Sequence, residues 1–365
     1  MKPLNTFIQV LIVLAVGLAA GCATPPGRPE AAKKNLPKYV FFPPAPDEPH
    51  IQFLTSFQTE QDLKRGMHAS FTTYLTGLKP KYIPISKPYG GFAGNGVIYV
   101  CDTAQNSILK LDFQNHRIGV VSPNEPAALQ MPVNLTIDSD GTMYVVDLIR
   151  QQLVILDKNG NVLGLVGEKG KNKPMDVAVT ADRIYLSDSA THNVHVLDKV
   201  TRKTLFDIPR PEDNTDITHR MFQPINIALA TNGDLVVSDL GASRVQVYDK
   251  DGKFVRSFGA HGNNAGEFFR NKGVAVDRNN YIYVADAAFD NVQIFNDQGR
   301  LLMPFGSANA DQASMELPSK VLIDYDDIPL FAQYIAPNFQ VEHLIIVLNQ
   351  YGPNRVAVYG FGHKK

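Results

Sequence analysis

Short apolar runs separated by polar turns recur along most of the chain. Valine, isoleucine, leucine and tyrosine dominate runs such as 97–100 (VIYV), 143–146 (MYVV) and 282–284 (IYV). Asn-Gly and Asp-Gly pairs, which favour tight hairpin turns, occur between such runs at 140–141, 159–160, 232–233 and 251–252. Because no stretch of helical periodicity lies between these runs, the pattern predicts sequential antiparallel strands.

An aspartate ends the second run in each of five repeats, at Asp102, Asp147, Asp188, Asp239 and Asp286. The spacings between them are 45, 41, 51 and 47 residues, a period typical of four-stranded propeller blades. A sixth repeat has Asn349 in this place and is longer because residues 327–342 are inserted. The repeats therefore predict an all-β fold, a six-bladed β-propeller.

The sixth repeat ends after its third predicted strand, at residues 355–362. Residues 50–57 (HIQFLTSF) resemble the fourth strand of the fourth repeat, 253–258 (KFVRSF). We therefore predict that the N-terminal strand completes the last blade by pairing with residues 355–359. This pairing would close the ring and remove exposed sheet edges.

The first 21 residues are typical of a secretory signal. Residues 7–18 are apolar but short for a membrane span, and small residues lead directly to Cys22. This end resembles the lipobox of bacterial lipoproteins, which implies that Cys22 is diacylated and becomes the mature N-terminus. Ala23 resembles an outer-membrane sorting signal. The alternatives are a plain cleaved signal and an uncleaved anchor.

Residues 22–49 are rich in proline, which breaks helices and cannot donate to a sheet ladder. We predict an extended tether without a ladder here, and the propeller over residues 50–365.

Residues 252–295 resemble two consecutive NHL repeats, with a glycine-rich link, a phenylalanine before the next inner strand and the strand Tyr-Val-Ala-Asp. The matching positions are Gly259, Gly262, Gly266, Phe268, Gly273 and Asp286. From residue 51 onwards the chain is similar to bacterial lipoproteins with NHL-type propellers. The resemblance implies four-stranded blades, and it leaves function open, because the family includes both binding scaffolds and enzymes.

Lysine and arginine together number 35 and aspartate and glutamate 36, which gives a formal net charge of −1. This balance argues against nucleic acid or an anionic membrane surface as the main partner. The chain has two cysteines, and with Cys22 lipidated neither a disulfide nor a zinc site is expected. Cys101 is expected to be a small buried residue.

The first predicted strand of each blade should start near the mouth of the central channel. The residues expected there are Gly90, Asn134, Asp176, Asn226, Gly273 and Lys320. The four polar ones, Asn134, Asp176, Asn226 and Lys320, are candidates for binding a small ligand, or a divalent cation through oxygen atoms. The alternative is that they hydrogen-bond to one another and to the backbone, and no cofactor is then expected.

The repeated aspartates have two interpretations, a cluster of carboxylates or a cap on the turn that follows each strand. We favour the cap, because every blade needs the same turn. His195 takes the place of Gln246 and Gln293 in their blades, and we interpret it as packing between blades.

Two longer loops are further candidates. The link 207–222 carries Arg210, His219 and Arg220, which either contact a partner or ligand or belong to a solvated loop. The insertion 327–342 is apolar, and it either caps the lower channel mouth, which we favour, or forms an exposed patch for a partner.

These observations together predict an exported lipoprotein anchored in the outer membrane through Cys22. Its propeller would be a non-enzymatic binding or scaffolding module for a protein or small ligand at the cell envelope. The alternative is a metal-dependent hydrolase or lyase at the channel mouth, similar to gluconolactonases or the peptidyl-hydroxyglycine lyase. The motifs of those enzymes are not matched residue by residue, and no nucleophilic triad is visible.

Overall fold

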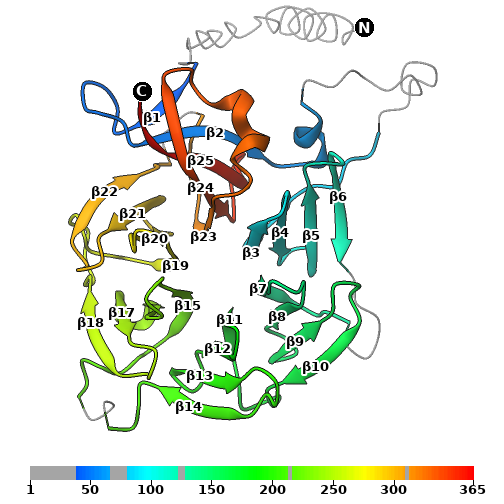
Figure 1. Ribbon diagram of the computed structural model, residues 1–365, viewed down its shortest axis with the longest axis vertical. Coiled ribbons are helices and arrows are strands. Elements are labelled where there is room, and N and C mark those ends of the chain that lie inside the picture. Colours follow the sequence, from blue (N-terminus) through cyan, green and yellow to red (C-terminus); the bar gives the residue numbers. More distant parts are fainter. Residues whose placement is uncertain (1–37, 66–79, 122–127, 213–215, 309–311) are drawn as a thin grey trace, which may run out of the picture. The chain divides into compact units, whose positions relative to one another are not determined.

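The computed structural model describes residues 38–65, 80–121, 128–212, 216–308 and 312–365. In these residues six antiparallel sheets stand in a ring (Figure 1). Each sheet is one blade, and consecutive blades are neighbours in the ring. The predicted all-β class and the number of blades are confirmed. Cys22 and the signal segment lie outside the described residues.

The strands follow the repeats. Blades one and two are β3 (Pro88–Gly94), β4 (Val97–Asp102), β5 (Ser107–Asp112) and β6 (Arg117–Val121), then β7 (Pro132–Ile137), β8 (Met143–Asp147), β9 (Gln152–Leu156) and β10 (Val162–Val166). Blades three and four are β11 (Pro174–Val179), β12 (Arg183–Asp188), β13 (Asn193–Asp198) and β14 (Thr204–Ile208), then β15 (Pro224–Leu229), β16 (Leu235–Asp239), β17 (Arg244–Tyr248) and β18 (Phe254–Phe258).

Blade five is β19 (Asn271–Val276), β20 (Ile282–Asp286), β21 (Asn291–Phe295) and β22 (Leu301–Phe305). Blade six has five strands, which from the inside outwards are β23 (Pro318–Asp324), β24 (Phe339–Asn349), β25 (Val356–Lys364), β2 (Ile51–Phe57) and β1 (Val40–Phe42). Three short 3-10 helices lie among the described residues, η1 (Glu60–Lys64), η3 (Leu240–Ala242) and η4 (Ile328–Tyr334). No helix in this part of the chain is long and apolar enough to span a membrane.

The core lies between neighbouring blades. The second strands β8 and β20 are buried at every position, whereas the outer strands β10 and β18 alternate between half-buried and exposed residues. Side chains alternate between the two faces of a strand, so a fully buried strand must have a blade packed on each side. Cys101 is completely buried between blades one and two, as expected.

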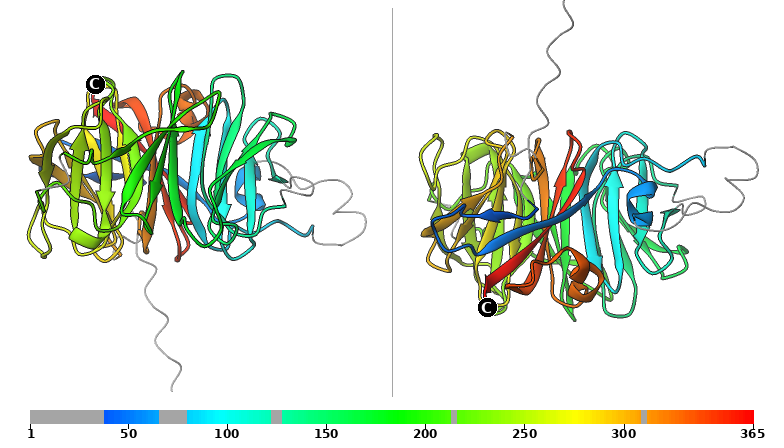
Figure 2. Two further views of the ribbon diagram at one scale, coloured as in Figure 1. Left: turned by 90° about the horizontal axis from the view of Figure 1, so that it is seen from below. Right: turned by 90° about the horizontal axis from the view of Figure 1, so that it is seen from above.

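The N-terminal strand closes the ring as predicted. β2 pairs antiparallel with β25, with Phe53 opposite Tyr359 and Phe57 opposite Val356. Both strands run along the outer part of blade six, β2 in blue and β25 in red (Figure 2). The chain thus joins its first and last strands in one sheet.

The prediction of a tether without a ladder is wrong for the last part of residues 22–49. Val40–Phe42 form β1, which pairs with β2 and gives blade six a fifth strand. Its three apolar residues lie between prolines, at Pro37 and Pro43, that restrict the pairing to this short stretch.

The insertion 327–342 does not cap the channel, which corrects our expectation. It forms η4, whose Phe331 is buried against Phe57 and Phe113 at the outer junction of blades six and one. Gln52 of β2 donates from Nε2 to the carbonyl of Tyr334 and accepts at Oε1 from the backbone N–H of Ala336. The insertion therefore fills the joint where the ring closes.

Candidate functional site

Six residues, one from each innermost strand, surround the propeller axis, and we call them the axial ring. They are Gly90, Asn134, Asp176, Asn226, Gly273 and Lys320. In every innermost strand the pairing register shifts at this position, which is typical of a β-bulge. Because a bulge redirects a side chain, this repeated irregularity points residues from different blades toward one another.

The structure brings three of the four predicted polar residues together. The Lys320 ammonium donates to Asp176 Oδ2 at 2.7 Å and to Asn226 Oδ1 at 2.8 Å. Asp176 also accepts from the backbone N–H groups of Val177 and Ile227. These contacts join blades three, four and six across the axis.

Asn134 is not part of this cluster. Its Oδ1 accepts from the backbone N–H of Leu135, and its buried Nδ2 has no acceptor among the described residues. Its neighbour in the ring must be glycine, because a Cβ on Gly90 would lie 2.4 Å from Asn134 Oδ1. A Cβ on Gly273 would similarly lie 2.6 Å from the Cα of Lys320. The two glycines let adjacent innermost strands approach closely.

Asp176 and Lys320 depend on each other electrostatically. Burial raises the pKa of Asp176, and the Lys320 ammonium opposes this rise. The Lys320 ammonium is hydrogen-bonded to Asp176 Oδ2 and Asn226 Oδ1, the two oxygens that a divalent cation would use as ligands. In the part of the chain that the structure describes, no three His, Cys, Asp or Glu side chains are grouped suitably for a metal ion. The contacts match our alternative, in which ring members hydrogen-bond to one another, and ligand binding by these four residues stays a prediction.

Four of the five repeated aspartates cap turns, as predicted, whereas Asp239 makes no side-chain cap and accepts from the N–H groups of Phe222 and Gln223. Asp286 accepts from Ala288 and Phe289 in the following turn. It also accepts from the N–H groups of Phe269 and Arg270, just before the innermost strand of its own blade. The same double role is found at Asp102, Asp147 and Asp188. One carboxylate therefore fixes both a turn and the approach to the axial ring.

A cavity of about 740 Å³ lies beside the link from blade three to blade four. It is lined by Thr191, His192, Asn193, Phe206, Asp207, Pro209, Arg210, Pro211, Arg220, Met221 and Phe222. Arg210 and Arg220 were predicted for partner or ligand contact, and the structure places both on this wall. We call this the link cavity.

Two charged groups of the link cavity are fixed by neighbours. Arg210 lies 3.6 Å from the centre of the Phe206 ring and donates from Nε to the carbonyl of Asp251. Asp207 accepts from His195 Nδ1 at 2.7 Å. Their charges are thus held in place by the protein itself.

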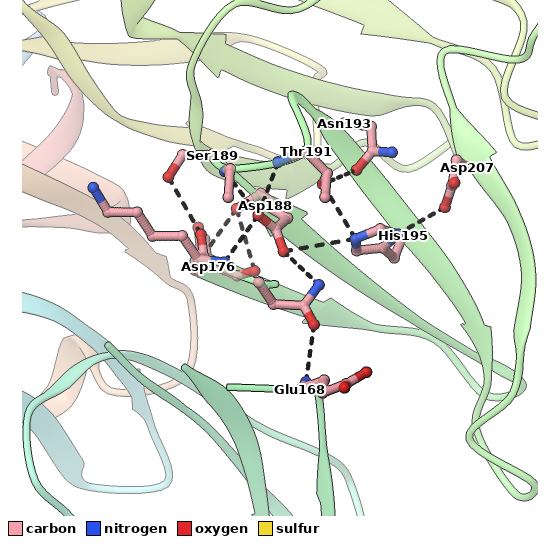
Figure 3. A network of polar contacts seen from close by, with 12 residues as sticks. Glu168, Asp176, Asp188, Ser189, Thr191, Asn193, His195 and Asp207 are labelled. Carbon is pink, nitrogen blue, oxygen red and sulfur yellow. Dashed lines mark hydrogen bonds and ion pairs between the residues drawn. The ribbon is translucent and has the colours of Figure 1, made fainter. Parts of the chain in front are cut away.

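His195 forms an ionic network within blade three, so its predicted role in packing between blades is wrong. Its ring lies between Asp207 on β14 and Asp188 at the end of β12 (Figure 3). Burial disfavours the imidazolium, but the two carboxylates outweigh it and raise the pKa of His195 to about 9. Burial also disfavours the charged form of Asp188, yet hydrogen bonds hold the pKa of that carboxyl at about 2. Sequence reasoning missed this network, because Asp207 comes to lie opposite His195 only when β14 pairs with β13.

His219, the third residue predicted for the link, does not line the cavity. Its ring stacks on Phe254 with the ring centres 4.0 Å apart, and its carbonyl accepts from the Tyr248 hydroxyl at 2.7 Å. It holds the link against blade four. Partner contact by these three residues stays a prediction.

Comparison with known proteins agrees with the fold. A family model described as a 6-bladed beta-propeller matches residues 220–301. A search of curated proteins finds no match. A protein of unknown function from Bacteroides thetaiotaomicron is similar at 12% identity and a TM-score of 0.57, covering 76% of this chain and 70% of that chain.

Two similar structures are enzymes. A gluconolactonase from Xanthomonas campestris is 15% identical with a TM-score of 0.53, covering 76% of this chain and 87% of that one. A virginiamycin B lyase from Staphylococcus aureus is 12% identical with a TM-score of 0.51, covering 77% and 85%. At these identities the similarity shows the fold alone.

Proposed function

We propose that the protein is an exported NHL-type propeller lipoprotein, anchored in the outer membrane through Cys22. In this proposal the propeller is a non-enzymatic binding module for a protein or small ligand at the cell envelope. The observation that carries the proposal is the link cavity, whose Asp207 and Arg210 are fixed by their own neighbours.

The link cavity is lined by both apolar and polar side chains. Phe206, Phe222 and Met221 supply apolar surface, and Phe222 is 45% exposed. A cavity of several hundred Å³ with this composition is typical of a ligand site. Because the charged groups are already ordered, a ligand would lose little free energy in ordering them.

Binding is favoured over metal-dependent catalysis by the axial ring. Its carboxylate, Asp176, is neutralised by Lys320, and the ammonium takes the space between the oxygens. A metal ion would have to displace a buried cation from that position. The alternative of a metal-dependent hydrolase or lyase is therefore the weaker candidate.

The test is recovery of a partner by the full-length lipoprotein purified in detergent from its own envelope. We expect a stoichiometric partner that is lost in Arg210→Ala and kept in Arg300→Ala, an exposed arginine far along the chain in blade five. Metal content measured on the same samples gives the opposing outcome. A stoichiometric metal that disappears in Asp176→Ala would overturn the proposal in favour of the metal-dependent enzyme.

A further inference from the structure

Lys272 is a buried lysine without a counter-charge. It lies directly before Gly273 of the axial ring and is 6% exposed. Its ammonium lies 5.2 Å from the centre of the Tyr89 ring, two blades further round the propeller. Among the described residues it makes no ion pair or hydrogen bond. Burying an ammonium that has no counter-charge and no hydrogen bond lowers the stability of the folded state. Such a group is therefore expected to have another role.

The charged groups that act on Lys272 are also positive. Burial lowers the pKa of Lys272 to about 8, together with repulsion by Arg270 and Lys87, which directly precede two of the innermost strands. Burial raises the pKa of Tyr89, Arg270 opposes this rise and Asp176 adds to it. No acidic group contributes to the shift at Lys272.

The charged residues around the propeller axis are also mostly positive. We define the rim as the residue before each innermost-strand start and the first two residues after it. Five of these positions are basic, Lys87, Lys173, Arg270, Lys272 and Lys320, and one is acidic, Asp176. Asp176 is already paired with Lys320. The nearest strand-end carboxylate in blade five, Asp286, faces backbone N–H groups instead.

We propose that the rim beside Lys272 binds a compact oxyanion, a phosphate or a carboxylate group, between Lys272, Arg270 and Lys87. Each of these three cations would gain from such an anion, and charge-assisted hydrogen bonds to oxyanions are among the strongest. The phenolic hydroxyl of Tyr89 supplies a further donor. This site is separate from the link cavity and does not depend on the function proposed above.

The test uses inorganic phosphate and malonate as probes, titrated calorimetrically into the full-length protein in detergent. We expect binding by the wild type and an affinity roughly ten- to a hundredfold weaker in Lys272→Met, because a charge-assisted hydrogen bond is removed. Lys158→Met, in the turn between β9 and β10 of blade two, is the matched control and should bind like the wild type. Preference for phosphate or for malonate tells which oxyanion the site accepts.

Folding of the variant is checked separately by its thermal midpoint without anion, which should not fall below that of the wild type. Arg210→Ala should leave phosphate affinity unchanged, so failure of this proposal and failure of the binding-module proposal are distinguishable. The proposal would be overturned if the wild type bound neither phosphate nor malonate. Equal affinities in the wild type and a folded Lys272→Met would overturn it as well.

Discussion

Lys320 and Lys272 occupy nearly equivalent places at the starts of two neighbouring innermost strands, and they differ in their partners. Both are buried, with exposed fractions of 7% and 6%. Lys320 reaches Asp176 and Asn226, whereas the nearest partner of Lys272 is the face of Tyr89. Burial of a cation alone does not reveal its role. The paired lysine joins blades, and the unpaired one leaves its charge available to a ligand.

The two lysines should therefore respond to mutation with opposite signs. Removing one member of a buried pair leaves the other charge uncompensated, which is strongly destabilising. Removing a buried charge that has no partner eliminates a desolvation penalty and repulsion from its neighbours. Each prediction below tests this contrast by changing a cation at constant or nearly constant side-chain volume.

The largest effect is expected for Lys320→Met. It should lower the free energy of unfolding by about 3–5 kcal/mol, because Asp176 is left buried without its counter-charge. Denaturant unfolding of the purified protein measures this change. The double variant with Asp176→Leu should recover most of the loss, since no buried charge remains. A loss below about 1 kcal/mol in the single variant would contradict the structural role of the pair.

His195 extends the comparison to a cation with two carboxylates. Its pKa is raised from 6.5 to about 9, so its stabilising contribution is fully present below pH 6.5 and is lost as pH rises through 9. The stability difference between the wild type and His195→Gln should fall by about 2 kcal/mol between pH 6.5 and 9, after allowance for the partial exposure of Asp207.

Denaturant unfolding at a series of pH values measures this difference. His192→Asn, a change at an exposed neighbouring histidine, should keep the pH dependence of the wild type. A pH-independent difference between the wild type and His195→Gln would show that the imidazolium contributes nothing to blade three.

Most of the fold could be predicted because each blade repeats the same local requirements. An aspartate recurs at the same place in five repeats and Asn349 takes that place in the sixth, which predicts the number of blades. The similarity between residues 50–57 and an outer strand predicted the closure. β1 was missed because three apolar residues between prolines are too short to signal a strand.

The site was predictable only in part, because pairing across the axis depends on distances that the sequence does not encode. Their places near the start of each predicted innermost strand identified Asn134, Asp176, Asn226 and Lys320, but not which of them would meet. Lys272 lies one residue before a ring position and was overlooked, although the Arg-Asn-Lys triplet at 270–272 shows two cations at one strand start. His195 was misread because its partner Asp207 lies on the next strand.

Lys272→Met should have the opposite sign to Lys320→Met. Loss of the unpaired ammonium should raise the free energy of unfolding by about 1–2 kcal/mol at pH 7 without added anion. Denaturant unfolding in a buffer without phosphate or carboxylate measures the gain, and Lys158→Met should be neutral. A clear loss of stability would mean that Lys272 has a compensating partner and that the two lysines are alike.

The smallest expected effect is the pH dependence of the stability gain in Lys272→Met, and its direction follows from the pKa of Lys272. The pKa of Lys272 is about 8 in the folded protein and 10.5 in the unfolded chain, so between these values the unfolded chain binds more protons. Wild-type stability should therefore rise relative to Lys272→Met from pH 8 to 10.5, and the advantage of the variant should shrink by on the order of 1 kcal/mol. Added phosphate should suppress this trend by keeping the ammonium charged. If the stability gain of Lys272→Met stays constant over this range, the folded protein does not disfavour the charged form of Lys272.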